Sequence, residues 1–479
     1  MKIDMKIQRT IFVAAFVGML GLVCNTGHAA DKPNIVYILV DNWGWGDIAL
    51  QGSTVPSPHI DNLAAQGMRL HNFNVQNQCT PTRSALMTGR YPIRSGTQKV
   101  AAPGEPQGMA PREYTIAELL SDSGYATAAY GKWHIGDKDG RFPNDQGFDQ
   151  WYGIPESAML ASFTSTPQFD PEIVPIPQIL QGKKGEKTET VKEFDLNTRA
   201  TLDYEVVTKS AAFVKKQAAA NKPFYLYVAL TQIHPPFLPQ PGFVNKSKAG
   251  PYADIQMQVD YNIGQVLDAI KEAGIEDNTI VVLTGDNAAG EKSNEWEGEG
   301  GSNGSWRGGL STGYEGGIRT PGMVRWPGKI PAGKVSDEIF ADLDWYSTLA
   351  HLVGEEKRIP TDRPMDSINQ ADFLLGKREK SNREYVVTFV GDKVFSVKWR
   401  TLKVHFLTAE GTFSPIVEHT FPPVYDIKND PGETRELWRS EGYSHIWVMR
   451  PVTEIVGKLQ VSMAKFPNIK PGEEFKGYK

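Results

Sequence analysis

Three continuous apolar runs, each followed by polar residues, constrain the fold of this chain most. They cover residues 34–40, 224–230 and 279–284 and are rich in β-branched and aromatic residues. Such runs are typical of strands that are buried on both faces of a parallel sheet. Helical patterns lie between them, at residues 115–123 with a capping box and at residues 256–272 with one apolar face. The alternation predicts an α/β domain with a large, mostly parallel sheet sandwiched by helices.

The pattern changes after residue 382. Residues 385–390, 394–399 and 402–406 are short apolar runs separated by turns, which indicates an antiparallel meander. Residues 452–463 have the pattern of a closing helix. A single core stops growing near roughly 250 to 300 residues, so we expect a large domain at 31–380 and a small antiparallel β subdomain with its closing helix at 381–479.

Two segments interrupt the large domain. Residues 161–197 and 287–305 are rich in glycine, proline or charged residues. In a parallel sheet, insertions of this kind run over the surface and carry specificity. We therefore expect both segments to lie over the site as loops.

The first thirty residues have the pattern of a signal peptide. Basic Lys2, Lys6 and Arg9 precede an apolar run at 11–24, and small residues follow it up to Ala30. The run is shorter than the roughly 20 residues that a membrane-spanning helix needs. We expect the mature chain to begin near residue 31, to be exported to the periplasm or secreted, and to have no stable membrane insertion.

Export would also change the charge and the thiol content. Without residues 1–30 the chain loses three of its 51 basic and one of its 56 acidic residues, which leaves a net charge near −7 and disfavours nucleic acid as a partner. Cys24 is lost as well, so Cys79 is the only remaining thiol. A lone cysteine is ordinarily a buried, inert residue. The neighbours of Cys79 point to another interpretation.

Polar residues follow each predicted buried strand. They are Asp41, Asn42, Lys132, His134, His234, Asp286 and Asn287. Any one of them could be a strand-end cap or a solvated group, but the carboxyl ends of parallel strands form one ligand-binding crevice. The aspartates and asparagines offer only oxygen ligands, which favours a hard cation such as calcium or magnesium over zinc.

Residues 78–90 read Gln-Cys-Thr-Pro-Thr-Arg-Ser-Ala-Leu-Met-Thr-Gly-Arg. This stretch closely resembles the signature of type I sulfatases, in which Cys-X-Pro-X-Arg directs oxidation of the cysteine to formylglycine (3-oxoalanine). Similar segments occur at residues 41–47, 131–134, 152–157, 285–287, 314–321 and 425–433. The resemblance implies an alkaline-phosphatase-like fold and hydrolysis of aryl sulfates or sulfated carbohydrates. It also implies one calcium ion per chain, in preference to magnesium, and a formylglycine-generating or anaerobic sulfatase-maturating enzyme as a partner.

The resemblance further implies a role for each matching residue. Formylglycine at Cys79 hydrates to a gem-diol, of which one hydroxyl attacks sulfur. Arg83 and Lys132 stabilise the anionic oxygens. His134 deprotonates the second hydroxyl to expel sulfate, and His234 protonates the leaving group.

Other positions of the site follow from the same resemblance. Ser157 matches a residue that hydrogen-bonds the sulfate or the diol, although it could be a plain loop hydroxyl, as Lys132 could be a surface lysine. The implied metal ligands are Asp41, Asn42, Cys79, Asp286 and Asn287.

Three positions depart from the pattern of the better-known arylsulfatases. Thr82 replaces the commonest serine of the oxidation motif, and Asn42 stands where a second aspartate is usual. Leu310 stands where the family often has a lysine that bridges the sulfate and the leaving group. We take Arg307 as a candidate replacement that binds substrate.

Two other functions fit parts of this pattern. A phosphodiester or phosphonate monoester hydrolase of the same superfamily is one, because sulfate and phosphate are nearly isosteric. A noncatalytic sulfoglycan-binding relative is the other, and Asn42 and Leu310 give it some support. The intact Cys79, Pro81 and Arg83 weigh against the binding protein, since binding alone needs no oxidation motif.

Overall fold

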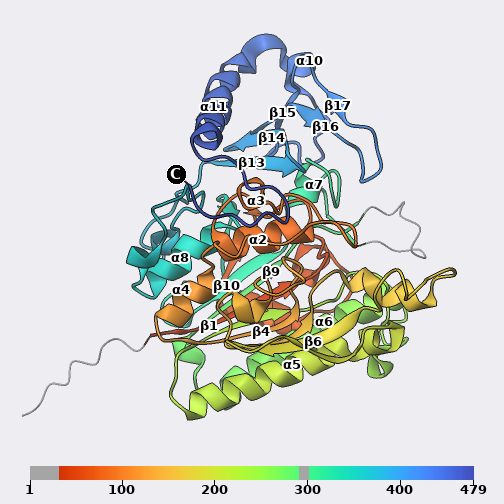
Figure 1. Cartoon of the computed structure of the whole chain (residues 1–479). Helices are drawn as coiled ribbons and strands as arrows, with labels where there is room; N and C mark the ends of the chain where they lie inside the picture. The colour runs from red at the N-terminus through yellow and green to blue at the C-terminus, as the bar shows by residue number, and fades with distance from the viewer. Residues whose placement is uncertain (1–31, 291–300, 479) are drawn as a thin grey trace, which may run out of the picture. The chain divides into compact units, whose positions relative to one another are not determined.

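A ten-stranded sheet lies at the centre of the computed structural model, which describes residues 32–290 and 301–478 (Figure 1). The strand order is β11-β2-β10-β9-β1-β8-β4-β5-β6-β7, and β9, β1, β8, β4 and β5 run parallel. The strands are β1 (Asn34–Val40), β2 (Met68–Leu70), β4 (Ala126–Lys132), β5 (Gln150–Ile154), β6 (Gln178–Lys183), β7 (Glu189–Glu193), β8 (Phe224–Ala229), β9 (Thr279–Gly285), β10 (Gly322–Arg325) and β11 (Lys334–Ser336). The predicted large, mostly parallel sheet is confirmed.

Helices cover both faces of this sheet (Figure 1). One face packs on α1 (Pro58–Gln66), α5 (Leu196–Ala219) and α6 (Pro251–Glu272), and the other on α2 (Cys79–Thr88), α4 (Ile116–Asp122) and α8 (Asp344–Leu352). The alternation along β1 explains the division, since Val36 and Ile38 join the first core and Ile35 and Tyr37 join the second. Each fully buried apolar side chain stabilises the fold by roughly 1.5–3 kcal/mol. Among the described residues no helix is long and apolar enough to cross a membrane.

The two helices that the sequence predicts are present. At α4 the Thr115 hydroxyl accepts from the Glu118 backbone N–H at 3.1 Å, and the Glu118 carboxylate accepts from the Thr115 N–H at 2.7 Å. This capping box satisfies two backbone donors of the first turn. Helix α6 begins at Pro251, five residues earlier than predicted, because a proline fits the first turn of a helix without loss of a hydrogen bond.

The first predicted insertion is not only a loop. Within residues 161–197, β6 and β7 form an antiparallel hairpin that extends the sheet beyond β5. The expectation of a loop over the site was therefore wrong for residues 178–193. Their many charged residues suit an exposed edge hairpin, where charge prevents pairing with another sheet. Most of the second insertion, 287–305, and the predicted signal peptide lie outside the described residues.

The C-terminal part contains the predicted antiparallel sheet. It consists of β13 (Tyr385–Val390), β14 (Lys393–Trp399), β15 (Leu402–His405) and β18 (Val424–Asp426) in that order. The closing helix α11 (Met449–Lys465) shares a core with this sheet. The chain from Pro33 onward clusters as one compact unit, and the division near residue 380 stays a prediction.

Shorter elements are β3 (Phe73–Asn74), β12 (Phe340–Ala341), β16 (Leu407–Thr408), β17 (Val417–Glu418), α3 (Pro92–Ser95), α7 (Glu315–Ile318), α9 (Ala371–Leu374) and α10 (Leu437–Glu441).

A buried ion cluster joins the small sheet to the large domain. The Glu315 carboxylate, at the start of α7, accepts from Lys398 Nζ at 2.7 Å and from Lys403 Nζ at 3.0 Å. Arg319 Nε donates to the same carboxylate at 2.5 Å. The Glu315 and Lys403 side chains are 0% exposed. Their charges have lost contact with water, and only the ion-pair partners compensate for that cost.

Replacement of Glu315 should therefore destabilise the whole chain. In Glu315→Gln the buried cations lose their shared anion, and we expect the free energy of unfolding to fall by about 3–5 kcal/mol. Denaturant titration followed by circular dichroism measures this change. The matched control is Glu454→Gln, which removes an exposed pair with Arg450 and should cost less than about 1 kcal/mol. Equal losses in the two variants would contradict the role of the cluster.

Candidate active site

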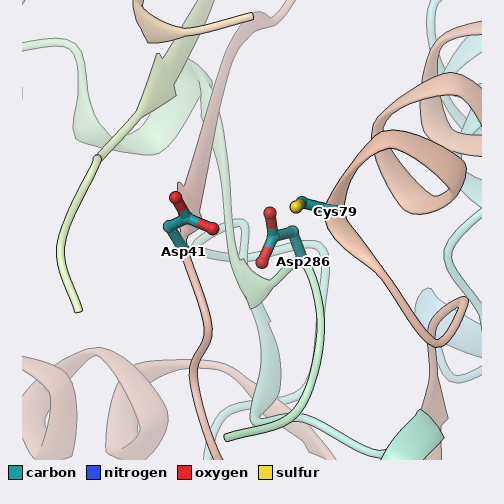
Figure 2. Close-up of side chains that lie close together, drawn as sticks. All are labelled: Asp41, Cys79 and Asp286. Atoms are coloured by element: carbon teal, nitrogen blue, oxygen red, sulfur yellow. The ribbon is translucent and has the colours of Figure 1, made fainter. Parts of the chain in front are cut away.

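Two strand ends and the start of one helix meet at a single point (Figure 2). Asp41 directly follows β1, Asp286 directly follows β9, and Cys79 is the first residue of α2. One ligand atom from each residue lies within 4.8 Å of the other two. All three are buried. Because β1 and β9 are parallel neighbours, their carboxyl ends bring the two carboxylates together, as expected for an open α/β sheet.

Two cationic side chains, Arg83 and Lys132, pair with these carboxylates. Arg83 lies one turn after Cys79, and its Nε and Nη2 donate to Asp286 Oδ2 at 3.0 and 2.8 Å. Its Nη1 donates to the backbone oxygen of Lys132 at 2.6 Å. Lys132 Nζ donates to Asp41 Oδ2 at 2.7 Å. The side chains are 0% exposed, so the charges are held in fixed geometry.

The donor set fits a divalent cation. Asp41 Oδ1 and Asn287 Oδ1 are buried and have no hydrogen-bond partner among the described residues, a costly state for a polar atom that no ligand satisfies. Asn42 lies beside them, and its Oδ1 accepts from Asn287 Nδ2 at 2.7 Å. Burial and the Asp41 carboxylate raise the pKa of Asp286, and Arg83 opposes this. Carboxylate and amide oxygens suit a hard cation.

Two imidazoles face this cluster. Burial, and then the charge of Lys132, lowers the pKa of His134 well below its ordinary value. The same two causes lower the pKa of His234 to about 3. Both rings are therefore neutral at neutral pH and able to accept a proton, and an anionic ligand would raise both pKa values.

The tautomer of His234 is fixed by its neighbours. His234 Nδ1 lies 2.6 Å from the backbone oxygen of Pro235, which can only accept, so Nδ1 carries the proton. Nε2 then holds the lone pair and lies 3.4 Å from the hydroxyl of Ser157. Ser157 also caps the 3₁₀ helix Ala158–Ser165. The structure thus brings Ser157 next to His234.

Arg307 occupies a different place. Its Nη1 donates to the backbone oxygen of Glu433 at 2.9 Å and its Nη2 to the Glu410 carboxylate at 2.8 Å. Its guanidinium lies 4.1 Å over the Tyr314 ring. These partners tie Arg307 to the C-terminal subdomain. Its predicted contact with substrate stays a prediction.

The sequence analysis missed two residues that hold the His234 loop. Arg199 on α5 is fully buried and donates to the backbone oxygens of Thr231 and His234 at 3.0 and 2.8 Å. Asp203, one turn later, accepts from the Thr231 N–H at 2.9 Å. The sequence does contain a signal for these two residues. Arg199 and Asp203 are four residues apart, on the helix face that also carries the buried Leu202 and Val206.

Cys79 itself is a neutral thiol in this setting. Burial raises its pKa to about 11, although Lys132 and Arg83 lower it. A cysteine that acts directly as a nucleophile has a lowered pKa, because the thiolate is the reactive form. The environment of Cys79 therefore disfavours direct thiolate catalysis.

The fold and this site define an enzyme of the alkaline-phosphatase-like superfamily, and comparison with known proteins identifies the family. The Sulfatase family model matches residues 33–355. The chain is 31% identical to the N-acetylgalactosamine-6-sulfatase of Canis lupus familiaris, over 91% of this chain and 87% of that protein. It is 28% identical to the steryl-sulfatase of Rattus norvegicus, over 95% and 93% of the two chains.

A solved structure supports the same family. The crystal structure of the PsFucS1 sulfatase from Pseudoalteromonas sp. matches with a TM-score of 0.85 and 30% identity, over 92% of each chain. The chain belongs to the sulfatase family and is a sulfuric ester hydrolase.

The raised pKa of Cys79 predicts how the unmodified thiol reacts. In a chain that begins at residue 31 and is produced without a maturation enzyme, alkylation by iodoacetamide should be slow at pH 8. It should accelerate as the pH approaches 11, because the thiolate forms only there. The same chain unfolded in urea should react with an ordinary midpoint near pH 8.5. Equal rates for folded and unfolded chains at pH 8 would contradict the burial of this thiol.

Proposed function

We propose that this sulfatase works through formylglycine made from Cys79 and through one calcium ion held by oxygen ligands. The juxtaposition of Cys79 with Asp41 and Asp286, within 4.8 Å, is the observation that carries the proposal. The ion would be held by Asp41, Asn42, Asp286 and Asn287, with position 79 facing it. Two buried oxygens that lack a hydrogen-bond partner among the described residues, Asp41 Oδ1 and Asn287 Oδ1, support this assignment.

Formylglycine and calcium would each supply a distinct chemistry. Formylglycine supplies a hydrated aldehyde, whose two hydroxyls can attack sulfur and then release sulfate, a route that serine lacks. Calcium supplies positive charge that polarises a sulfate oxygen. Arg83 and Lys132 lie beside position 79 and would hold the remaining anionic oxygens in place.

The charges of the site favour an anion. Asp41 and Asp286 balance Arg83 and Lys132, so a bound divalent cation would leave the site positive. The whole chain carries a net charge of −5. A locally positive, buried site in an acidic protein attracts the anionic sulfate ester.

The two imidazoles would have different roles in proton transfer. His134 is neutral because its pKa is lowered, and we propose that it accepts the proton of the hydroxyl at position 79 in the release step. His234 Nε2 has no proton in the resting tautomer. The sulfate ester would raise its pKa, and the protonated ring would then donate to the leaving oxygen.

Two further residues are proposed to bind substrate. The Ser157 hydroxyl beside His234 can donate a hydrogen bond to a sulfate oxygen. For Arg307 a sulfate contact requires the guanidinium to exchange the exposed Glu410 carboxylate for the ligand. Such an exchange would supply the positive charge that Leu310 does not provide.

The substrate class that we propose is an aryl sulfate or a sulfated carbohydrate. Relatives named for N-acetylgalactosamine-6-sulfate and for steryl sulfate show that the family accommodates different alcohols. We further propose that residues 1–30 direct export, and that a formylglycine-generating or anaerobic sulfatase-maturating enzyme binds the chain around Cys79. Because Cys79 is buried in the folded chain, such an enzyme must act on the unfolded segment.

The modification can be tested directly. After coexpression with a maturation enzyme, the peptide with position 79 should be lighter by about 18 Da, and the protein should hydrolyse 4-nitrophenyl sulfate. Cys79→Ala should lower kcat/KM by at least about 10³-fold, since no other residue replaces the nucleophile. Thr82→Ser keeps the hydroxyl that bonds the Gln76 N–H and is the matched control, for which conversion should persist. Preferential hydrolysis of bis(4-nitrophenyl) phosphate would favour a phosphodiesterase instead.

The cation can be tested by its effect on folding. A calcium concentration about 100-fold above Kd should stabilise the folded chain by about 2.7 kcal/mol, which calorimetry records as a higher melting temperature. Asp41→Asn removes one ligand charge and should abolish most of that shift. The control Asp337→Asn changes an exposed aspartate, 87% accessible, and should keep it. A larger shift with magnesium than with calcium would contradict the choice of ion.

A further inference from the structure

A groove of about 850 Å³ lies on the C-terminal subdomain, between residues 419–425 and helix α10. Three aromatic rings form part of its wall. Phe421 is 52% exposed and Tyr443 is 69% exposed, and Trp438 lies between them in the chain. Exposed aromatic side chains gathered in one hollow indicate a binding surface. We call this hollow, lined by Phe421, Trp438, Tyr443, Tyr425, Arg435 and Arg439, the aromatic groove.

The rings are held in defined positions. The Phe421 ring lies 5.2 Å from the Trp438 ring and 6.0 Å from the Tyr443 ring, both edge to face. Trp438 Nε1 donates to the backbone oxygen of Pro422 at 2.6 Å, which fixes the indole. A preorganised aromatic wall loses little entropy when a ligand binds.

Cations border the rings. The Arg439 side chain is 92% exposed, and its nearest carboxylate, Glu436, lies 3.8 Å away. Glu436 in turn accepts from the backbone N–H groups of Trp438 and Arg439 at 2.7 and 3.1 Å, so its charge is directed at the start of α10. Arg435 is 65% exposed and pairs with Glu441 at 3.1 Å. Two exposed guanidinium groups thus lie at the rim of the groove, where the Glu436 carboxylate also lies.

Arg307 is a neighbour of one wall residue of the groove. Burial raises the pKa of Tyr425, a wall residue, and the neighbouring Arg307 guanidinium opposes the shift. Four residues after Arg307, the Ser311 N–H donates to the backbone oxygen of Asn77 at 2.9 Å. Asn77 lies two residues before Cys79. The segment 307–311 thus has a neighbour in the wall of the groove at one end and a backbone contact with the segment before α2 at the other.

We propose that the aromatic groove binds a sulfated oligosaccharide, as a second contact with a chain that presents its sulfate ester at position 79. The inference rests on the proposed sulfatase function and names the substrate class. Sugar rings present C–H faces that pack on aromatic rings, and the polar edges of aromatic rings accommodate hydroxyls. Sulfate groups accept paired hydrogen bonds from the planar guanidinium of arginine. Rings and guanidinium groups together fit an anionic carbohydrate better than either an apolar or a neutral ligand.

Binding to a chain without a nucleophile tests the groove. Cys79→Ala protein is titrated calorimetrically with oligosaccharides from dextran sulfate, chondroitin sulfate and carrageenan, and with unsulfated dextran. In this background Phe421→Ala with Tyr443→Ala, and separately Arg439→Ala, should weaken binding of at least one sulfated probe by about tenfold. Unsulfated dextran should bind more weakly than that probe, and added salt should reduce the difference.

Matched controls lie outside the groove. Phe413 is 91% exposed and Arg450 is 86% exposed, and neither lines the groove. Phe413→Ala and Arg450→Ala should leave binding within about twofold of the parent, a change below 0.5 kcal/mol. Circular dichroism melting of every variant shows whether the subdomain remains folded.

Three results would overturn the proposal. One is equal binding of every sulfated probe by the groove variants and the controls. Another is equal binding of sulfated and unsulfated probes. The third is a dimer, detected by sedimentation, that the groove substitutions convert to monomer without a change in sugar binding. The groove would then be an interface between two copies of the chain.

The kinetics separate this inference from the proposed function. In matured protein with intact Cys79, the groove variants should lose more kcat/KM on a sulfated oligosaccharide that the protein hydrolyses than on 4-nitrophenyl sulfate. Absence of turnover of every sulfate ester in the matured parent would reject the formylglycine mechanism, while the calorimetric binding would still report on the groove.

Discussion

The two buried ion pairs, Arg83 with Asp286 and Lys132 with Asp41, are the interaction on which the rest of the site depends. Removal of four charges from water costs several kcal/mol per ion unless each is paired with good geometry. The pairs meet that condition, with contacts of 2.7 to 3.0 Å and no exposure. Because Arg83 also donates to the backbone of Lys132, helix α2 is fixed to the ends of β4 and β9 at once. Position 79, one turn before Arg83, therefore faces the carboxylates.

The strand order determines which groups meet around that position. Strands β9, β1, β8 and β4 are consecutive neighbours, so Asp286, Asp41, His234 and Lys132 follow one another along a single edge of the sheet. Each strand is buried on both faces and cannot slide without exposing apolar side chains. Helix α5 fixes the member of this row that lies furthest beyond its strand, since Arg199 binds the backbone of the His234 loop. The large hydrophobic core thus sets the spacing of the charged groups.

The residues at strand ends could be predicted from the sequence because local pattern and chemistry coincide there. A continuous apolar run identifies a buried strand, and its first polar residue falls at the edge where ligands bind. The hairpin at residues 178–193 and helix α5 could not be predicted in the same way. The hairpin is rich in charge because it is an exposed edge, and α5 contains buried Arg199 and Asp203, which resemble solvated residues until the partner loop is known. The position of Arg307 depends on Glu410 and Glu433, more than a hundred residues later in the chain, and no local pattern reports such a contact.

The segments that resemble the sulfatase family therefore serve two different physical purposes. Cys79, Arg83 and Lys132 belong to the site for which we propose the chemistry, whereas Glu315, in the segment 314–321, lies in the buried cluster with Lys398 and Lys403. The backbone N–H of Glu315 also donates to the Glu433 carboxylate at 2.7 Å, and Glu433 belongs to the segment 425–433. These two segments form a joint that holds the small sheet against the loop of Leu310. The C-terminal subdomain also contacts that loop directly, since the Thr412 hydroxyl donates to the Leu310 backbone oxygen at 3.3 Å. A change of side chain at Leu310 leaves this backbone contact in place.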